Sequence, residues 1–370
     1  MIHKKVRLFA CIEKNLGDDL FIYLVCNRYK NVKFEISSNA KYLKVNNIQN
    51  LKYSYFLKFW LNISNRNSNK LIKSIIVNVE NYIFKIIIPK KEAIYIVGNA
   101  LKNENYSSSK QIRWLKRRID ISSKFYLLST NYGPSNSENW LKDCKNVLKK
   151  MTDVCFRDKI SYDLFKDLKN VRYAPDAVLT LYINKSRSDR NKKYILISVI
   201  DCKMNNRNIK LQESADIYEK KMIDVVNLYN KDGYDVILFN SNREQDEPAS
   251  KRIYDKCIDK SKVHIYNYSG NLNEVFELYE KAKAIIATRL HTIILGFLYD
   301  IPVVPIIYDI KVKNLLLSYD FNGYKKEIFD LKDFTFEEVK NNINNYEFKI
   351  SKELIKDANN QFLNTDELLK

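Results

Sequence analysis

The chain has 370 residues, of which 45% are hydrophobic, and this composition excludes an intrinsically disordered protein. Its length exceeds the span that one hydrophobic core usually serves, so two domains are expected. The formal net charge of +19 would suit nucleic acid. However, Lys is abundant together with Asn, Ile and Tyr, which indicates a general compositional bias. No motif of aromatic and basic residues supports nucleic-acid binding.

Cysteines and apolar runs bound the class of protein further. Six scattered cysteines form no CxxC pair, and no histidine stands at metal-ligand spacing, so reduced thiols and no metal site are expected. The first apolar run, Val6–Ile12, is too short for a signal peptide and is predicted to be a strand. The apolar region Ala284–Tyr308 is interrupted by charged residues and by Pro302, so it is not a predicted membrane span. We therefore expect a soluble, cytoplasmic protein.

Short apolar runs alternate with helical patterns in the first half of the chain, which is typical of an α/β fold with largely parallel sheets. One helix is predicted at Asp18–Tyr29, after Gly17. Another is predicted across Leu71–Ile87, where isoleucines and a valine recur at helical spacing until Pro89. The predicted strands are Val6–Ile12, Val32–Ile36, Ala93–Val97, Phe125–Thr130 and Val154–Arg157.

A polar, charged stretch at 181–193 lacks hydrophobic periodicity and is predicted to be a linker. The α/β alternation then restarts. Predicted strands are Tyr194–Ile200, Asp235–Asn240, Val263–Tyr266, Ala284–Ala287 and Val303–Ile307. Predicted helices are Glu213–Asn230, Gln245–Lys260, Leu272–Lys281, Leu290–Tyr299 and Lys311–Tyr319.

The two halves predict an α/β protein of two Rossmann-like domains with a central cleft. We expect an N-terminal domain over 1–180, a C-terminal domain over 194–320 and a helical segment over 321–370. Packing of that last segment back on the N-terminal domain is one expectation. In doubly wound sheets, ligands bind beyond the carboxyl ends of the strands, so residues between a strand and the next helix are the candidates for function.

Arg289 and His291 stand where the predicted strand Ala284–Ala287 runs directly into a helix. A strand end needs no cation for packing. The two side chains therefore suit a ligand site, the guanidinium for a phosphate or carboxylate and the imidazole for proton transfer. The structural alternative has His291 capping the helix and Arg289 paired with a neighbouring acid.

Five stretches in chain order resemble the signature of the polysaccharide pyruvyl transferase family. They are Asn15–Leu20, Asn131–Pro134, Phe156–Ser161 with Ala174–Ala177, Asp246-Glu247, and Arg289–His291 followed by Gly296, Ile301-Pro302, Tyr308 and Lys311. The resemblance implies two Rossmann-like domains arranged as in type-B glycosyltransferases. It implies that the pyruvyl unit of phosphoenolpyruvate, a co-substrate rather than a cofactor, is transferred to a sugar. The product would be a pyruvate ketal on a cell-surface or exopolysaccharide glycan, with release of phosphate.

The resemblance and the chemistry together imply a role for each motif residue. His291 is the candidate general acid, and Arg289 and Arg157 are candidates for binding the phosphate and carboxylate. The C-terminal domain would take the donor, and the N-terminal domain would take a glycan or lipid-linked sugar acceptor. Asp18 could equally cap its helix, and Asp158 is expected to hold Arg157 by an ion pair. The remaining candidates for substrate binding are Leu290, Lys311, Asn15, Gly17, Asp18, Asn131, Gly133 and Asp176.

The chain departs from the family pattern at two loops. Val97–Ala100 keeps one glycine, Gly98, where the family usually has a Gly-Gly-Ser-type loop. Asp201-Cys202-Lys203 follows the first strand of the second domain, where an Arg-bearing loop is frequent. Two alternatives therefore stay open: a type-B glycosyltransferase that uses a nucleotide sugar, and a non-catalytic family member that binds glycan.

A predicted helix at Gln111–Ile119 groups four basic residues, among them Arg117 and Arg118, with Trp114 and Leu115. This pattern fits a solvated basic face. It also fits a peripheral contact with the anionic inner face of a membrane, where a lipid-linked acceptor would lie.

Overall fold

The computed structural model describes residues 4–37, 41–55, 57–58, 89–102, 108–135, 137–181 and 194–370. The chain forms two compact units. The first unit consists of Met1–Ile12, Phe21–Ala177 and Asp357–Lys370, and the second of Glu13–Leu20 and Val178–Lys356. In the described ranges, no helix has both the length and the apolar character needed to cross a membrane.

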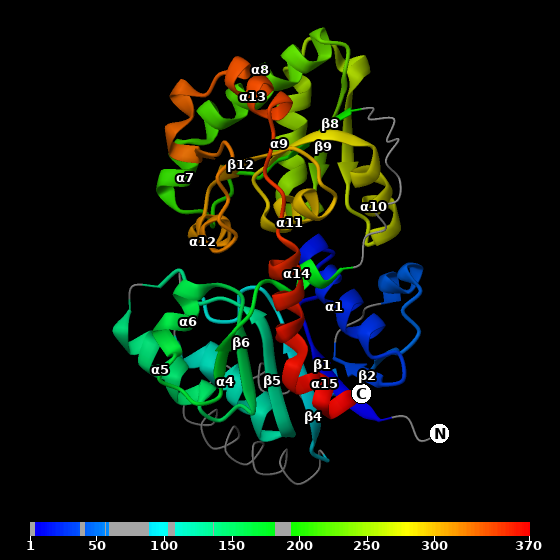
Figure 1. Ribbon diagram of the computed structural model, residues 1–370, viewed down its shortest axis with the longest axis vertical. Coiled ribbons are helices and arrows are strands. Elements are labelled where there is room, and N and C mark those ends of the chain that lie inside the picture. Colours follow the sequence, from blue (N-terminus) through cyan, green and yellow to red (C-terminus); the bar gives the residue numbers. More distant parts are fainter. Residues whose placement is uncertain are drawn as a thin grey trace, which may run out of the picture. The chain divides into compact units, whose positions relative to one another are not determined.

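The first unit is built on a seven-stranded parallel sheet (Figure 1). Its strand order is β3-β2-β1-β4-β5-β6-β7, and the reversal of order between β1 and β4 is that of a Rossmann fold. The strands are β1 (Lys5–Phe9), β2 (Lys33–Ile36), β3 (Leu51–Tyr53), β4 (Lys91–Ile96), β5 (Ser122–Thr130), β6 (Asp153–Phe156) and β7 (Val171–Tyr173).

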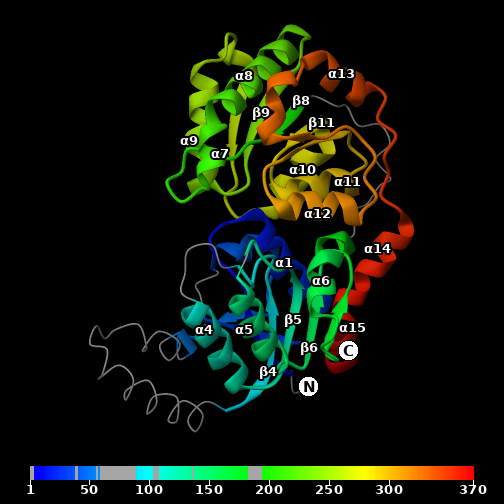
Figure 2. The same ribbon diagram turned by 90° about the vertical axis from the view of Figure 1, so that its left-hand side faces the viewer.

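Helices cover this sheet and complete its core. α4 and α5 lie side by side against it (Figure 2). Trp140, Leu115, Phe125 and Phe156 are almost fully buried there, and removal of such apolar surface from water is the main term that stabilises the unit. The helices that contribute to the first unit are α1 (Leu16–Arg28, from Phe21 on), η1 (Lys41–Asn46), α4 (Ser108–Asp120), α5 (Glu138–Leu148), α6 (Lys159–Phe165), η6 (Asn359–Phe362) and α15 (Leu363–Leu369).

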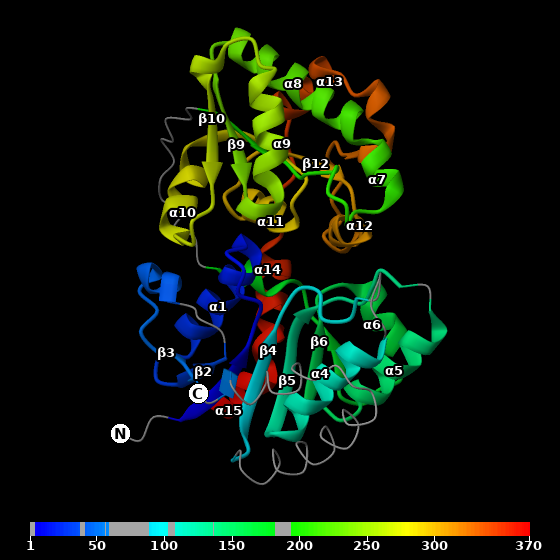
Figure 3. The ribbon, with the colours of Figure 1, turned by 180° about the vertical axis from the view of Figure 1, so that it is seen from behind.

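The second unit repeats the same strand order in a six-stranded parallel sheet, β10-β9-β8-β11-β12-β13. Its strands are β8 (Tyr194–Ser198), β9 (Asp235–Asn240), β10 (Val263–Asn267), β11 (Ala282–Ala287), β12 (Val303–Ile307) and β13 (Lys326–Glu327). α8 (Ala215–Lys231) and α9 (Arg243–Asp255) pack next to each other on this sheet (Figure 3). Its other helices are η3 (Ala177–Thr180, from Val178 on), α7 (Ile209–Glu213), η4 (Lys260–Lys262), α10 (Leu272–Lys281), α11 (Leu290–Leu298), α12 (Ile310–Ser318), η5 (Ile328–Asp333), α13 (Phe336–Asn344) and α14 (Lys352–Ala358, up to Lys356).

The unit boundaries differ from the predicted domains at two places. Residues 321–356 belong to the second unit, and only 357–370 belong to the first. In the first unit, buried Gln361 accepts from the Ser129 amide at 2.9 Å and donates to the Ala174 carbonyl at 2.7 Å, which ties the end of the chain to β5 and to the residue after β7. α15 lies beside α1, where Arg28 pairs with Asp366 at 2.6 Å (Figure 1).

The segment Glu13–Leu20 belongs to the second unit, although it lies within the range expected for the N-terminal domain. Its backbone explains the difference, because the Leu16 amide donates to the Ser241 carbonyl at 2.9 Å and Asn15 forms a β-bridge with Asn242. The helix predicted across Leu71–Ile87 and the linker residues 182–193 lie outside the described residues.

The basic helix α4 is only partly a solvated basic face. Ile112 and Leu115 are buried against the sheet. Arg118 is buried too, with its guanidinium carbon 3.3 Å from the centre of the Trp114 ring, and burial lowers its pKa to about 9. Arg113 and Lys116 remain exposed. Arg118 is therefore not one of the four expected outward cations, because its side chain packs on Trp114.

Candidate active site

Arg289 and His291 lie where β11 passes into α11, and the chain turns there because Thr288 is fixed to β8. The Thr288 hydroxyl donates to the Ser198 carbonyl at 2.6 Å. Arg289 occupies the N-cap position of α11 in an extended conformation, so its side chain stands at the positive end of the helix dipole. Leu290, a predicted substrate contact, is buried in the core of the unit.

Arg289 is paired with an acid, as in the structural alternative. Its Nε and Nη2 both donate to the carboxylate of Asp246, and Nη2 also donates to Gln245 Oε1 at 3.1 Å. Burial lowers the pKa of Arg289, but Asp246 and Tyr308 outweigh burial and raise that pKa overall. Arg289 is therefore a fixed cation whose direction Asp246 sets.

Three cations gather around the phenol of Tyr308 in the second unit. Lys311 Nζ lies 5.3 Å from the Tyr308 ring centre and 3.4 Å from Asp309. Burial raises the pKa of the phenol, but Lys311 and Arg289 lower it by more, and Arg207 acts in the same direction. Lys311, Arg289 and Arg207 thus all act on the phenol as cations, and Asp246 and Asp309 are the carboxylates that pair with Arg289 and Lys311.

Arg207 is the functional candidate that the sequence prediction missed. It lies in the loop between β8 and α7, where its Nε donates to the Asp201 carbonyl at 3.3 Å. Its Nη2 is buried and has no hydrogen-bond partner in the part of the chain that the structure describes. A buried donor left without an acceptor costs about 1–3 kcal/mol. An anionic ligand would supply that acceptor.

The loop after β8 does carry an arginine, Arg207, but it lies beyond the stretch Asp201-Cys202-Lys203 on which the departure from the family pattern was predicted. β8 ends at Ser198, and the loop extends as far as Asn208. The stretch Asp201-Cys202-Lys203 has a structural role. Asp201 pairs with Arg252 at 2.7 Å, and Lys203 pairs with Asp216 at 2.7 Å. A search of the whole loop for basic residues would have found Arg207.

Gly17 and His291 meet within the second unit, although they are far apart in the sequence. A Cβ atom at position 17 would overlap the His291 imidazole. The start of α1 is held by Asn15, whose side-chain oxygen accepts from the Gly17 amide at 3.0 Å and whose carbonyl accepts from Asp19 at 3.0 Å. Asn15 thus takes the capping position that was considered for Asp18, and Asp18 lies in the first helical turn.

Substitution Gly17→Ala should displace the His291 ring and leave the fold intact. Gly to Ala within a helix gains up to about 1 kcal/mol of helix propensity, which offsets part of the steric conflict. We expect loss of catalytic turnover with a thermal midpoint close to that of the unchanged protein. Circular dichroism melting measures the stability, and release of phosphate from phosphoenolpyruvate measures the turnover that the family resemblance implies. Full activity in the variant would show that the glycine does not position the imidazole.

A second polar cluster stands at the carboxyl edge of the first sheet. Arg157 follows β6, and its Nη1 pairs with Asp176 at 2.9 Å, with exposed side-chain fractions of 5% and 0%. Arg157 Nη2 donates to Asn131 Oδ1 at 3.0 Å. A Cβ at Gly98 would lie 2.8 Å from Arg157 Nη1, so the single glycine of that loop makes room for the guanidinium. Gly133, with φ +91°, donates its amide to the Leu101 carbonyl at 2.9 Å.

The expected partner of Arg157 was Asp158, and that prediction is wrong. Asp158 caps α6 instead, accepting from the Ser161 amide at 2.8 Å and the Ser161 hydroxyl at 2.7 Å. Asp158 directly follows Arg157 and its carboxylate bonds to the first turn of α6. Asp176 lies in the segment after β7, and its carboxylate contacts the Arg157 guanidinium. Among the described residues, no three acidic, histidine or cysteine side chains gather as a metal site would require.

Comparisons with known structures agree on the fold. A UDP-GlcNAc 2-epimerase from Neisseria meningitidis, solved with UDP-GlcNAc, matches with a TM-score of 0.62 and 12% identity over 99% of each chain. TarM matches with a TM-score of 0.55 and 10% identity, covering 100% of this chain and 96% of TarM. A UDP-N-acetylglucosamine 2-epimerase from Rickettsia bellii matches with a TM-score of 0.55 and 12% identity over 99% of this chain and 95% of its own. These similarities show an α/β fold like that of type-B glycosyltransferases.

Sequence comparison identifies the family. Curated protein sequences give no match to this chain. The family model described as polysaccharide pyruvyl transferase matches residues 15–310, which is most of the chain and contains the residues of both polar clusters except Lys311. The chain therefore belongs to the polysaccharide pyruvyl transferase family.

Proposed function

We propose that this protein transfers the pyruvyl unit of phosphoenolpyruvate to two hydroxyls of a sugar in a cell-surface or exopolysaccharide glycan. The supporting observation is the cluster of Arg207, Arg289 and Lys311 around Tyr308, in which Arg207 Nη2 is buried without an acceptor among the described residues. A small polyanion such as phosphoenolpyruvate, with a phosphate and a carboxylate, matches several cations set close together. His291 stands two positions along from Arg289.

The chemistry assigns one proton transfer to His291. The imidazolium would deliver a proton to the methylene carbon of phosphoenolpyruvate, which becomes a methyl group and leaves an oxocarbenium-like centre. A sugar hydroxyl adds to that centre and loses its proton. Departure of phosphate regenerates the cation, and a second hydroxyl closes the ketal and releases a second proton. One of the two released protons restores His291 and the other goes to solvent or phosphate.

The other site residues divide by what they contact. Arg289, directed by Asp246, and Arg207 would bind the anionic groups, with Lys311 as the weaker partner. Arg157 already donates to Asp176 and Asn131, so its role in this proposal is to position the loop of Asn131 for an acceptor. Asn15, Gly17, Asp18 and Gly133 remain candidates for acceptor contacts.

Substitution Arg207→Ala should weaken the binding of phosphoenolpyruvate by about ten- to a hundredfold, since hydrogen bonds to charged groups contribute about 1.5–3 kcal/mol. The measurement is the ligand-dependent rise of the thermal midpoint, because a ligand of the native state stabilises by mass action. Arg243→Ala, at a largely exposed arginine of α9, is the matched control and should bind normally.

Four outcomes of that titration would contradict the proposal. Phosphoenolpyruvate would fail to raise the midpoint of the unchanged protein, or would stabilise Arg207→Ala equally well. Stabilisation by a nucleotide sugar in its place would favour the type-B glycosyltransferase alternative. Stabilisation by glycan alone, without phosphoenolpyruvate binding or turnover, would favour a non-catalytic glycan-binding protein.

We also propose that α4 makes an electrostatic membrane contact. Its apolar side is buried, so Arg113 and Lys116 would act through charge alone, at about 1 kcal/mol per residue near an anionic surface. We expect Arg113→Glu with Lys116→Glu to abolish sedimentation with phosphatidylserine vesicles at low salt. Binding that survives the double substitution, or that persists in high salt, would contradict this contact.

A further inference from the structure

A cavity outside both polar clusters lies next to β3, the outermost strand of the first sheet. It lies between β3 and η1, has a volume of about 420 Å³ and is lined by Leu43, Lys44, Ile48, Lys52, Tyr53 and Tyr55 among others. β3 runs parallel to its neighbour β2, so its last residue, Tyr53, lies at the carboxyl ends of the strands. Asn131 and Arg157 lie at the same end of the sheet. Ligands of doubly wound sheets bind at this end.

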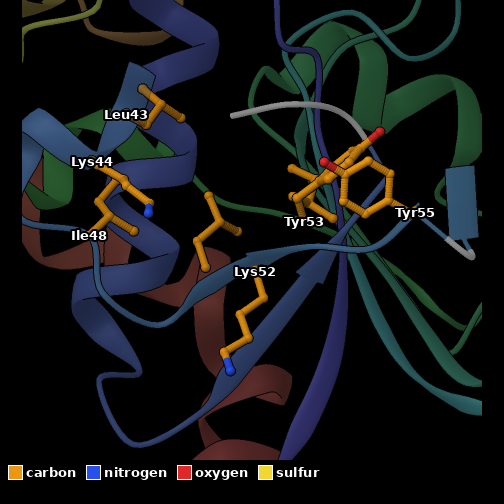
Figure 4. A pocket seen from close by; sticks show the side chains of 8 residues that line it. Leu43, Lys44, Ile48, Lys52, Tyr53 and Tyr55 are labelled. Carbon is orange, nitrogen blue, oxygen red and sulfur yellow. The ribbon is translucent and has the colours of Figure 1, made fainter. Parts of the chain in front are cut away.

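The walls of the cavity differ in chemistry. Leu43 and Ile48 are buried and form one apolar side, and the rings of Tyr53 and Tyr55 stand together on the other (Figure 4). The two ring centres are 4.4 Å apart at an interplanar angle of 76°. Tyr55 is 71% exposed, whereas a large aromatic side chain is mostly buried when its task is packing. An aromatic pair with one exposed ring, opposite an apolar wall, indicates a surface that a ligand covers.

The charged residues that line the cavity are both basic. Lys44 and Lys52 line it, and Lys58 Nζ lies 5.8 Å from the Tyr53 ring centre. None of the described lining residues is a carboxylate. Glu35, on the neighbouring strand, is already paired with Lys91 at 2.7 Å. The cavity therefore combines aromatic rings, two phenolic hydroxyls and an excess of positive charge.

We propose that this cavity binds an acidic sugar of the acceptor glycan, a hexose ring that carries a carboxylate or a phosphate. The apolar face of a hexose packs on an aromatic ring, its hydroxyls bond to phenol and ammonium groups, and its acid group is attracted by Lys44 and Lys52. The volume lies in the usual range for small-molecule sites. This inference rests on the proposed function, because it names the class of sugar that the transferase would select.

Calorimetric titration of the full chain tests the cavity without phosphoenolpyruvate. The probes are glucuronic acid, glucose 6-phosphate, glucose and inorganic phosphate. We expect at least one acidic sugar to bind about tenfold more tightly than glucose or phosphate, and Tyr55→Ala to lower that affinity by about three- to tenfold. Lys44→Ala with Lys52→Ala should lower it further. The preferred probe tells whether the acid group is a carboxylate or a phosphate.

Two control variants carry comparable exposed residues elsewhere. Phe329→Ala removes a half-exposed aromatic ring and Lys313→Ala an exposed lysine of the second unit, and both should bind as the unchanged protein does. Equal binding by all variants, no binding by the unchanged protein, or phosphate binding as tight as the preferred acidic sugar would overturn the inference.

Repetition of the titration with His291→Gln separates this inference from the proposed function. If acidic sugars bind there while neither protein releases phosphate from phosphoenolpyruvate, the proposed function fails and the sugar site stands. If phosphate release depends on an acceptor but none of the acidic sugars binds, the sugar site fails and the proposed function stands.

Discussion

Substitution His291→Gln is expected to lower the rate of pyruvyl transfer by about 10²–10⁴-fold, the usual contribution of a general acid. The binding of phosphoenolpyruvate should change little, because the amide keeps a polar side chain of similar length while Arg207 and Arg289 remain. Stopped-flow or coupled phosphate release gives kcat, and thermal stabilisation gives affinity. His264→Gln, at an exposed histidine of β10, is the matched control.

The role of His291 is identified by comparing the effects of the substitution on turnover and on phosphoenolpyruvate binding. Loss of turnover with retained binding indicates proton transfer by His291. Loss of binding alone would instead make it a ligand contact, and unchanged turnover would remove it from the mechanism. The Gly17→Ala variant should give the same pattern as His291→Gln, because the new methyl group occupies the position of the imidazole ring.

Substitution Asp176→Ala is expected to destabilise the first unit by about 3–5 kcal/mol, since it leaves the buried guanidinium of Arg157 without its carboxylate. Urea unfolding followed by circular dichroism measures the change. The control is Asp167→Ala, which breaks an exposed pair with Lys145 and should leave the urea midpoint almost unchanged, because surface ion pairs contribute little.

A double variant distinguishes a lost charge pair from lost packing. Arg157→Met with Asp176→Leu replaces both charges by apolar groups and should recover part of the stability, because no buried charge is then left unpaired. If Asp176→Ala unfolds no more easily than Asp167→Ala, the pair does not hold the loops at the edge of the sheet, and Arg157 would be available for an anion.

The two Rossmann-like sheets could be predicted because their long strands and helices have clear periods. Asp235–Asn240, Leu272–Lys281 and Val303–Ile307 were predicted with the bounds that the structure has. β3, β7 and β13 were missed, since two or three residues carry no periodic signal. Their pairing depends on neighbouring strands that are distant in the sequence.

The motifs of the candidate site could be predicted from the sequence, but the contacts between its residues could not. The sequence places Arg289 and His291 at a strand end, yet it does not indicate that Asp246 holds the arginine or that Gly17 admits the imidazole. Both contacts join segments separated by many residues. Arg207 was missed for a different reason. It lies near the end of the loop between β8 and α7, whereas the motif comparison covered only the first residues of that loop.

The most direct test of the central claim is product analysis with isotope-labelled phosphoenolpyruvate. The protein is incubated with the labelled donor and with acidic and neutral sugar acceptors, and the sugars are examined by mass spectrometry and NMR. We predict a labelled ketal methyl group on an acceptor and one phosphate released per ketal, with both products formed about 10²–10⁴-fold more slowly by His291→Gln. Phosphate release without any labelled sugar, or a glycosidic product formed only from a nucleotide sugar, would contradict the account.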